Sequence, residues 1–168
     1  MYQVGDWIYY GNIGACQVIE VGKKKIPGLK EERLYYTLQP LNSDCSISIP
    51  ADSGKVFMRP VISKAEAEHL IGLIPTMTPK AYYNGALRQL SEHYEALLNS
   101  HDCQELIQMT MSIYEKKKEA ALQKRKLGAV DEKFMKRAED LLFGELSIAL
   151  GIERNQVQNY IETKIKQA

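Results

Sequence analysis

Basic side chains are concentrated in residues 116–137 of this 168-residue chain. The stretch holds nine lysines and arginines and only three acidic residues, although the whole chain has a formal net charge of only +1. Lysine and arginine bind phosphate oxygens, and the free N–H groups at a helix start favour the same ligand. The stretch therefore predicts a surface for a polyanion, with a solvated helix end and loop as the alternative. The strongest candidates lie around Gly128: Lys124, Arg125, Lys126, Lys133, Lys136 and Arg137.

Catalytic motifs are missing from the sequence. It contains no P-loop, no dinucleotide-binding glycine motif, no His-Glu-x-x-His pair and no nucleophile elbow. The three histidines, His69, His93 and His101, lie without metal-ligand spacing. We therefore predict that the protein is not an enzyme and needs no cofactor, metal or small-molecule substrate.

The predicted compartment follows from the cysteines and the hydropathy. Cys16, Cys45 and Cys103 are odd in number and far apart, which is typical of reduced thiols in a cytoplasmic protein. No apolar run approaches the ~20 residues that a membrane-spanning helix needs. The first residues show no signal-peptide pattern. We expect a cytoplasmic protein that does not contact a membrane.

Residues 1–62 have the pattern of short strands. Trp7–Tyr10 is bulky and β-prone, and residues 15–21 alternate with Cys16 and Val18 on one face. Glycines in residues 11–14 suit a tight connection, and two more strands follow. In the last of these, Ser46 and Ser48 alternate with isoleucines, which predicts one wet face. Five short strands favour a small barrel of the SH3 or Tudor type.

Residues 63–168 have helical patterns instead. Ser63 and Glu66 form a capping box, and Asp102 begins a second box-like start. Thr78 and Pro79 are predicted to start a helix that Asn84-Gly85 could interrupt. The predicted architecture is an α+β protein of two domains, a β-barrel over 1–62 and an all-α bundle of about five helices over 63–168.

The C-terminal half of the bundle carries further signals. Gly128 is predicted to stop one helix, Asp131 to cap the next, and Gly151 to end that one. The apolar spacing of this second helix predicts a buried face. Its predicted core residues are Phe134, Ala138, Leu141, Leu142, Ile148 and Ala149.

Three stretches resemble the CarD family of bacterial transcription regulators. They are "VGDWIYYGNIGACQVIEV" from Val4, "LNSHD" from Leu98 and "FMKRAEDLLFGELSIALG" from Phe134. The resemblance spans nearly the whole chain. It implies a Tudor-like first domain that binds the β subunit of RNA polymerase. The matching positions for this contact are Lys24, Ser46 and Ser48, although some members have arginine where Ser48 stands.

The resemblance also implies a second contact, with promoter DNA at the upstream edge of the melted region. Well-known members place a tryptophan there, but the only tryptophan of this chain is Trp7. Counting from either side puts Tyr83 or Leu87 at the corresponding place. An apolar or aromatic wedge is physically possible with either residue.

The predicted function is therefore transcription regulation through RNA polymerase, with sequence-neutral backbone contacts to promoter DNA that tune the stability of the open complex. The alternative is a protein-only adaptor whose helical domain binds another protein rather than DNA. The direction of regulation, the promoters and the oligomeric state stay open.

Overall fold

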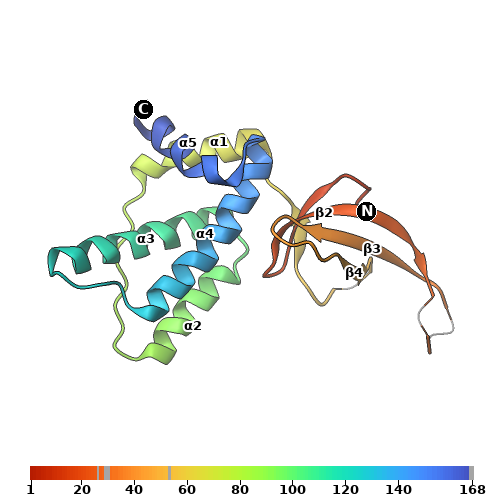
Figure 1. The fold of residues 1–168 in the computed structure, drawn as a ribbon, viewed down its shortest axis with the longest axis horizontal. Coiled ribbons are helices and arrows are strands. Elements are labelled where there is room, and N and C mark those ends of the chain that lie inside the picture. The colour runs from red at the N-terminus through yellow and green to blue at the C-terminus, as the bar shows by residue number, and fades with distance from the viewer. Residues whose placement is uncertain (26, 29–30, 53, 167–168) are drawn as a thin grey trace. The chain divides into compact units, whose positions relative to one another are not determined.

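The computed structural model describes residues 1–25, 27–28, 31–52 and 54–166. The chain divides into two compact units, Met1–Ile62 and Ser63–Ala168. The first is a five-stranded antiparallel sheet and the second contains five α-helices (Figure 1). The predicted fold class, a β domain followed by a helical domain, is confirmed.

The strands pair in the order β4-β3-β2-β1-β5, so that β4 and β5 are the edge strands. Their core contains Ile8, Cys16, Val18, Tyr36, Leu38 and Ile49. Cys16 lies here as a free thiol, and burial raises its pKa to about 11. The strands are β1 (Trp7–Tyr10), β2 (Gly14–Lys24), β3 (Arg33–Pro40), β4 (Ile47–Pro50) and β5 (Met58–Pro60).

A β-bulge interrupts the alternation of β2. Val18 pairs with Leu38 and Glu20 with Thr37, so that Ile19 is the extra residue and is exposed. After the bulge the faces exchange, and Val21 packs against the core while Glu20 is exposed. The predicted alternation is therefore right as far as Val18 and wrong beyond it.

The helical unit is arranged around its longest helix, α4 (Ala129–Leu150), which contacts the other four α-helices. They are α1 (Lys64–Leu73), α2 (Leu87–Leu98), α3 (Cys103–Leu122) and α5 (Arg154–Lys166), and a short 3₁₀ helix, η1 (Ile74–Thr76), follows α1 (Figure 1). None of the helices that the structure describes is long and apolar enough to span a membrane.

Three predicted helix boundaries are confirmed by their capping geometry. The Ser63 hydroxyl accepts a hydrogen bond from the Glu66 amide at 3.1 Å, and the Asp102 carboxylate accepts one from the Gln104 amide at 2.8 Å. Gly151 ends α4 with a left-handed φ of 71°.

Other predicted boundaries are wrong. The helix expected from Pro79 begins at Leu87, because the preceding segment is held by tertiary contacts rather than by a helical ladder. Gly128 does not stop α3, which ends at Leu122, but is itself the N-cap of α4. Asp131 is therefore not a cap; it lies in the first turn of α4 and is buried.

The predicted core of α4 is largely confirmed. Phe134, Ala138, Leu141 and Leu142 are buried. Ile148 and Ala149 are only partly buried, and Leu146 and Leu150 take the interior positions at that end of the helix. The predicted stripe is therefore right as far as Leu142 and differs from the buried positions in the last two turns of α4.

Candidate functional site: an open strand edge and a basic helix junction

The outer face of β4 brings two predicted contact residues together. The Lys24 ammonium, at the end of β2, donates to the Ser48 hydroxyl at 3.2 Å and to the Thr37 hydroxyl at 3.3 Å. Thr37 pairs with Ser48 across the β3–β4 ladder. Ser46 is also exposed but lies just before β4 begins. The lysine therefore supplies a positive charge beside the edge strand.

Ser48 directs its backbone toward the open side of β4. The Ala51 amide donates to the Leu34 carbonyl at 2.9 Å, which makes these two a hydrogen-bonded pair. Hydrogen-bonded pairs alternate with non-hydrogen-bonded pairs in an antiparallel ladder. The Thr37–Ser48 pair, three positions further on in register, is therefore non-hydrogen-bonded. The N–H and C=O of Ser48 can accordingly receive another strand.

The second predicted surface lies where α3 gives way to α4, and we call it the basic junction (residues 123–137). The Lys124 amide donates to the Ala121 carbonyl at 3.0 Å and the Arg125 amide to the Ala120 carbonyl at 2.8 Å. Lys124 adopts a left-handed φ of 56° to close this turn. The chain then leaves α3 and enters α4 at Gly128, with exposed side chains over residues 123–126.

The basic side chains of residues 116–137 divide into two groups. Arg137 donates to the Glu95 carboxylate at 2.8 Å, Lys116 pairs with Asp131 at 3.0 Å, and Lys118 pairs with Glu115 at 2.8 Å. The other group is exposed and forms no ion pair among the residues that the structure describes. Its members at the basic junction are Lys124, Arg125, Lys126, Lys133 and Lys136.

A buried polar network lies beneath the basic junction. The Asp131 carboxylate accepts a hydrogen bond from the Tyr94 hydroxyl at 2.5 Å. It also forms an ion pair with Lys116, whose side chain is only 12% exposed. Burial and the neighbouring Asp131 raise the pKa of Tyr94. The network ties α2, α3 and α4 together. Lys116 belongs to the basic stretch of the sequence, but its charge is paired with Asp131, fifteen residues further along the chain.

Tyr83 and Leu87, the two predicted wedge residues, are both exposed, at 59% and 64%. The Tyr83 hydroxyl donates to the Glu119 carboxylate, and the Lys116 ammonium lies 5.0 Å from the Tyr83 ring centroid. Tyr83 also lines an open hollow of about 430 Å³ together with Arg125 and Lys126. The structure thus brings Tyr83, but not Leu87, to the lining that these two basic residues share.

The comparison with protein families matches the first unit. Residues 2–62 fit the family model of the CarD-like/TRCF RID domain. The N-terminal unit is therefore similar to the CarD-like RID domain over nearly its whole length. The match confirms the resemblance over these residues and connects the chain to transcription through interaction with RNA polymerase, whereas the similar stretches from Leu98 and Phe134 lie outside it. No curated protein matches the chain.

The match includes the edge strand β4 but does not include the helical unit. Both Lys24 and Ser48 belong to the RID domain, whereas the basic junction lies outside the matched residues. The RID domain family is an interaction family rather than a catalytic one in this role.

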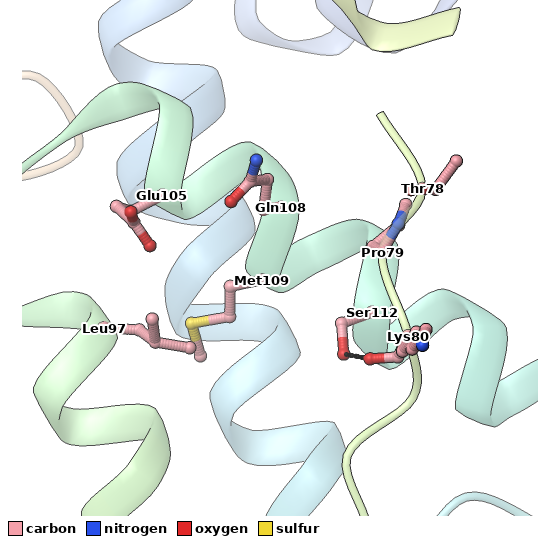
Figure 2. Close-up of a pocket in the computed structure, with 8 residues that line it drawn as sticks. All are labelled: Thr78, Pro79, Lys80, Leu97, Glu105, Gln108, Met109 and Ser112. Atoms are coloured by element: carbon pink, nitrogen blue, oxygen red, sulfur yellow. Dashed lines mark hydrogen bonds between the residues drawn. The ribbon is translucent and has the colours of Figure 1, made fainter. Parts of the chain in front are cut away.

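A further hollow lies in the helical unit, between α3 and the segment before α2. It measures about 310 Å³, with Leu97 and Met109 on one side (Figure 2). The Ser112 hydroxyl donates to the Lys80 carbonyl at 2.7 Å and holds the segment against α3. The described part of the chain contains no group of three His, Cys, Asp or Glu residues that could hold a metal ion.

Proposed function

We propose that the protein is a transcription regulator that binds the RNA polymerase β subunit through β4 of its RID domain. The match of residues 2–62 to this domain family carries the proposal. The outward backbone of Ser48 supports strand addition, and Lys24 adds one positive charge beside it.

The helical unit acts in this proposal on promoter DNA beside the melted region. The unpaired cations of the basic junction contact phosphates, and such contacts position a protein without reading sequence. Binding to polymerase holds the helical unit at high effective concentration near the DNA, so that weak contacts suffice. A preference for open over closed DNA of ~1.4 kcal/mol would change the open-complex equilibrium tenfold.

Tyr83 is the better wedge candidate of the two. Its ring is exposed and lies at a hollow shared with Arg125 and Lys126, whose charges would face the neighbouring phosphates. Replacing Tyr83 with Ala should shorten open-complex lifetime more than replacing Leu87 with Ala. Equal lifetimes for the two variants would remove the wedge from the proposal.

Strand addition is tested by pull-down of the polymerase β subunit with Ser48→Pro. Proline removes the outward amide donor and leaves the ladder to β3 intact, since that amide does not pair inward. Binding should fall, whereas the control Ser48→Ala, which keeps the amide, should bind as the parent does. Unchanged binding by a folded Ser48→Pro protein would show that β4 is not the contact edge.

The DNA contact is tested separately, on a promoter fragment with polymerase present. If the helical unit contacts phosphates, the affinity for the fragment falls as salt rises, more steeply with the parent than without the basic side chains. If salt has no such effect, the helical unit serves as a protein-only adaptor instead.

A further inference from the structure

The connection between α4 and α5 is a short, sharply defined turn. α4 ends at Leu150 and α5 begins at Arg154, so that only residues 151–153 join them. Gly151 has a left-handed φ of 71°, and the amides of Gly151 and Ile152 both donate to the Ser147 carbonyl, at 3.0 and 3.1 Å. The two helices of a helix-turn-helix are joined by three or four residues that often include a glycine, so this connection has the length and the residue type that the motif uses.

The packing around this turn also fits that motif. Leu146, Ser147 and Leu150 are buried on α4, and Val157 is fully buried on α5. Ser147 is small, and its hydroxyl donates to the Gly144 carbonyl at 2.7 Å, so it can lie in the interior without an unsatisfied polar atom.

A third helix supports the pair. α1 contacts both α4 and α5, and its Ala67 and Ile71 are buried. Glu68 of α1 accepts a hydrogen bond from the Tyr160 hydroxyl and lies 3.9 Å from the Lys164 ammonium of α5. α1, the end of α4 and α5 thus form a compact three-helix group (Figure 1). α5 is fixed on its inner side and free on its outer side.

The outer side of α5 carries neutral amides together with the exposed Glu162, which accepts a hydrogen bond from the Gln158 amide at 3.4 Å. Its exposed amide residues are Asn155, Gln156, Gln158 and Asn159. Asn155 and Asn159 are four residues apart and therefore lie on one face of the helix. An amide offers a donor and an acceptor side by side, which is the pattern that adenine presents in the major groove. Exposed helix faces that bind proteins are instead enriched in aromatic residues, methionine and arginine.

We propose that α4, residues 151–153 and α5 form a helix-turn-helix, and that α5 enters the major groove of duplex DNA and reads adenine through Asn155 and Asn159. Lys166 places positive charge in the last turn of α5, where the polyanionic backbone would pass. This surface differs from the basic junction, whose contacts carry no sequence information.

The two surfaces are close enough to engage one duplex. Lys133 and Gly151 are 151 − 133 = 18 residues apart along α4, which is about 27 Å of helix. One turn of duplex DNA measures about 34 Å. Phosphate contacts at one end of α4 can therefore accompany base contacts at the other.

The test selects bound DNA with the full chain, at low salt, from duplexes with a randomised central segment. A motif containing adenine should be enriched. Asn159→Ala should lower the affinity for the enriched duplex about tenfold. The same change should leave affinity for a scrambled duplex, and the salt slope, unaltered. Gln104→Ala, which removes an exposed amide from α3, serves as the matched control and should bind both duplexes as the parent does.

Two results would overturn the helix-turn-helix: no enriched motif, or the same motif and affinity after changing both Asn155 and Asn159 to Ala. Neither residue is buried, so both variants should fold. If the basic junction does not contact phosphates, a different result is expected. Replacing Lys133 with Gln would then leave the salt slope unchanged on both duplexes, while the dependence on Asn159 would persist.

Discussion

Lys116 and Lys126 are only ten positions apart and belong to the same basic stretch, yet the fold uses them differently. Lys116 is almost buried and pairs with Asp131, while Lys126 is exposed in the loop between α3 and α4. The charge of Lys116 is already neutralised within the protein, whereas that of Lys126 is available to a partner. The number of basic residues in a segment thus overstates the charge that a polyanion can meet.

The largest expected effect is on the free energy of unfolding when Lys116 is replaced. Lys116→Met leaves the Asp131 carboxylate buried without its cation, which should lower the free energy of unfolding by about 3–5 kcal/mol. Urea denaturation measures this loss. The neighbouring exposed Lys117→Met should change stability by less than about 0.5 kcal/mol. If the two variants were equally stable, Lys116 would have to be counted with the surface charges.

Removal of unpaired cations should affect DNA binding instead. Replacing Lys126, Lys133 and Lys136 with Gln should reduce the slope of log affinity against log salt by up to about 3, since each phosphate contact contributes about 0.9. The reduction should be equal on unrelated duplexes. Urea denaturation should show stability within about 0.5 kcal/mol of the parent, because these side chains are exposed. A parental slope would refute the proposed phosphate contact.

Arg137 lies between the two groups, because it is half-exposed and pairs with Glu95. Arg137→Gln should cost only about 0.2–1 kcal/mol of stability, as expected for a partly exposed ion pair. Its effect on the salt slope should be smaller than that of Lys136→Gln, which removes an unpaired cation one residue away. Equal slopes for the two variants would mean that Glu95 does not retain Arg137 when DNA binds.

The smallest expected effect comes from His93, whose ring stacks on Tyr82 at a centroid distance of 3.7 Å. Burial lowers the pKa of His93 below its ordinary value of 6.5. The unfolded chain therefore binds the proton more readily than the folded one, and stability should fall as pH drops below about 6.5. His93→Gln should weaken this pH dependence in thermal unfolding. Identical pH profiles for the parent and His93→Gln would show that protonation of His93 does not lower the stability of the fold.

Local chemistry made part of this molecule predictable from sequence. Ser63, Asp102 and Gly151 each act on backbone groups within four residues, so their roles could be inferred from their immediate neighbours. The strand-like pattern of residues 1–62 and its family signature were likewise sufficient to predict the RID domain.

Long-range contacts account for what the sequence did not show. Asp131 looks like an N-cap because an aspartate near a helix start usually is one, but Tyr94 and Lys116 bind it inside the fold. Pro79 resembles a helix start, yet Ser112 holds the adjacent Lys80 carbonyl against α3. The alternation of β2 could not reveal the bulge at Ile19, because the extra residue is defined by the partner strand.

The left-handed turn at Lys124 implies a trade-off between the stability of the fold and the positive charge that it offers to a polyanion. Glycine commonly closes such a turn, since a side chain at positive φ costs about 1–2 kcal/mol, and glycine itself loses about 0.5–1 kcal/mol of backbone freedom. Lys124→Gly should therefore give a protein about 0.5–1 kcal/mol more stable but one cation poorer at the end of α3. A lysine at this position means that the turn is not optimised for stability, and that selection for heat tolerance alone would tend to replace it.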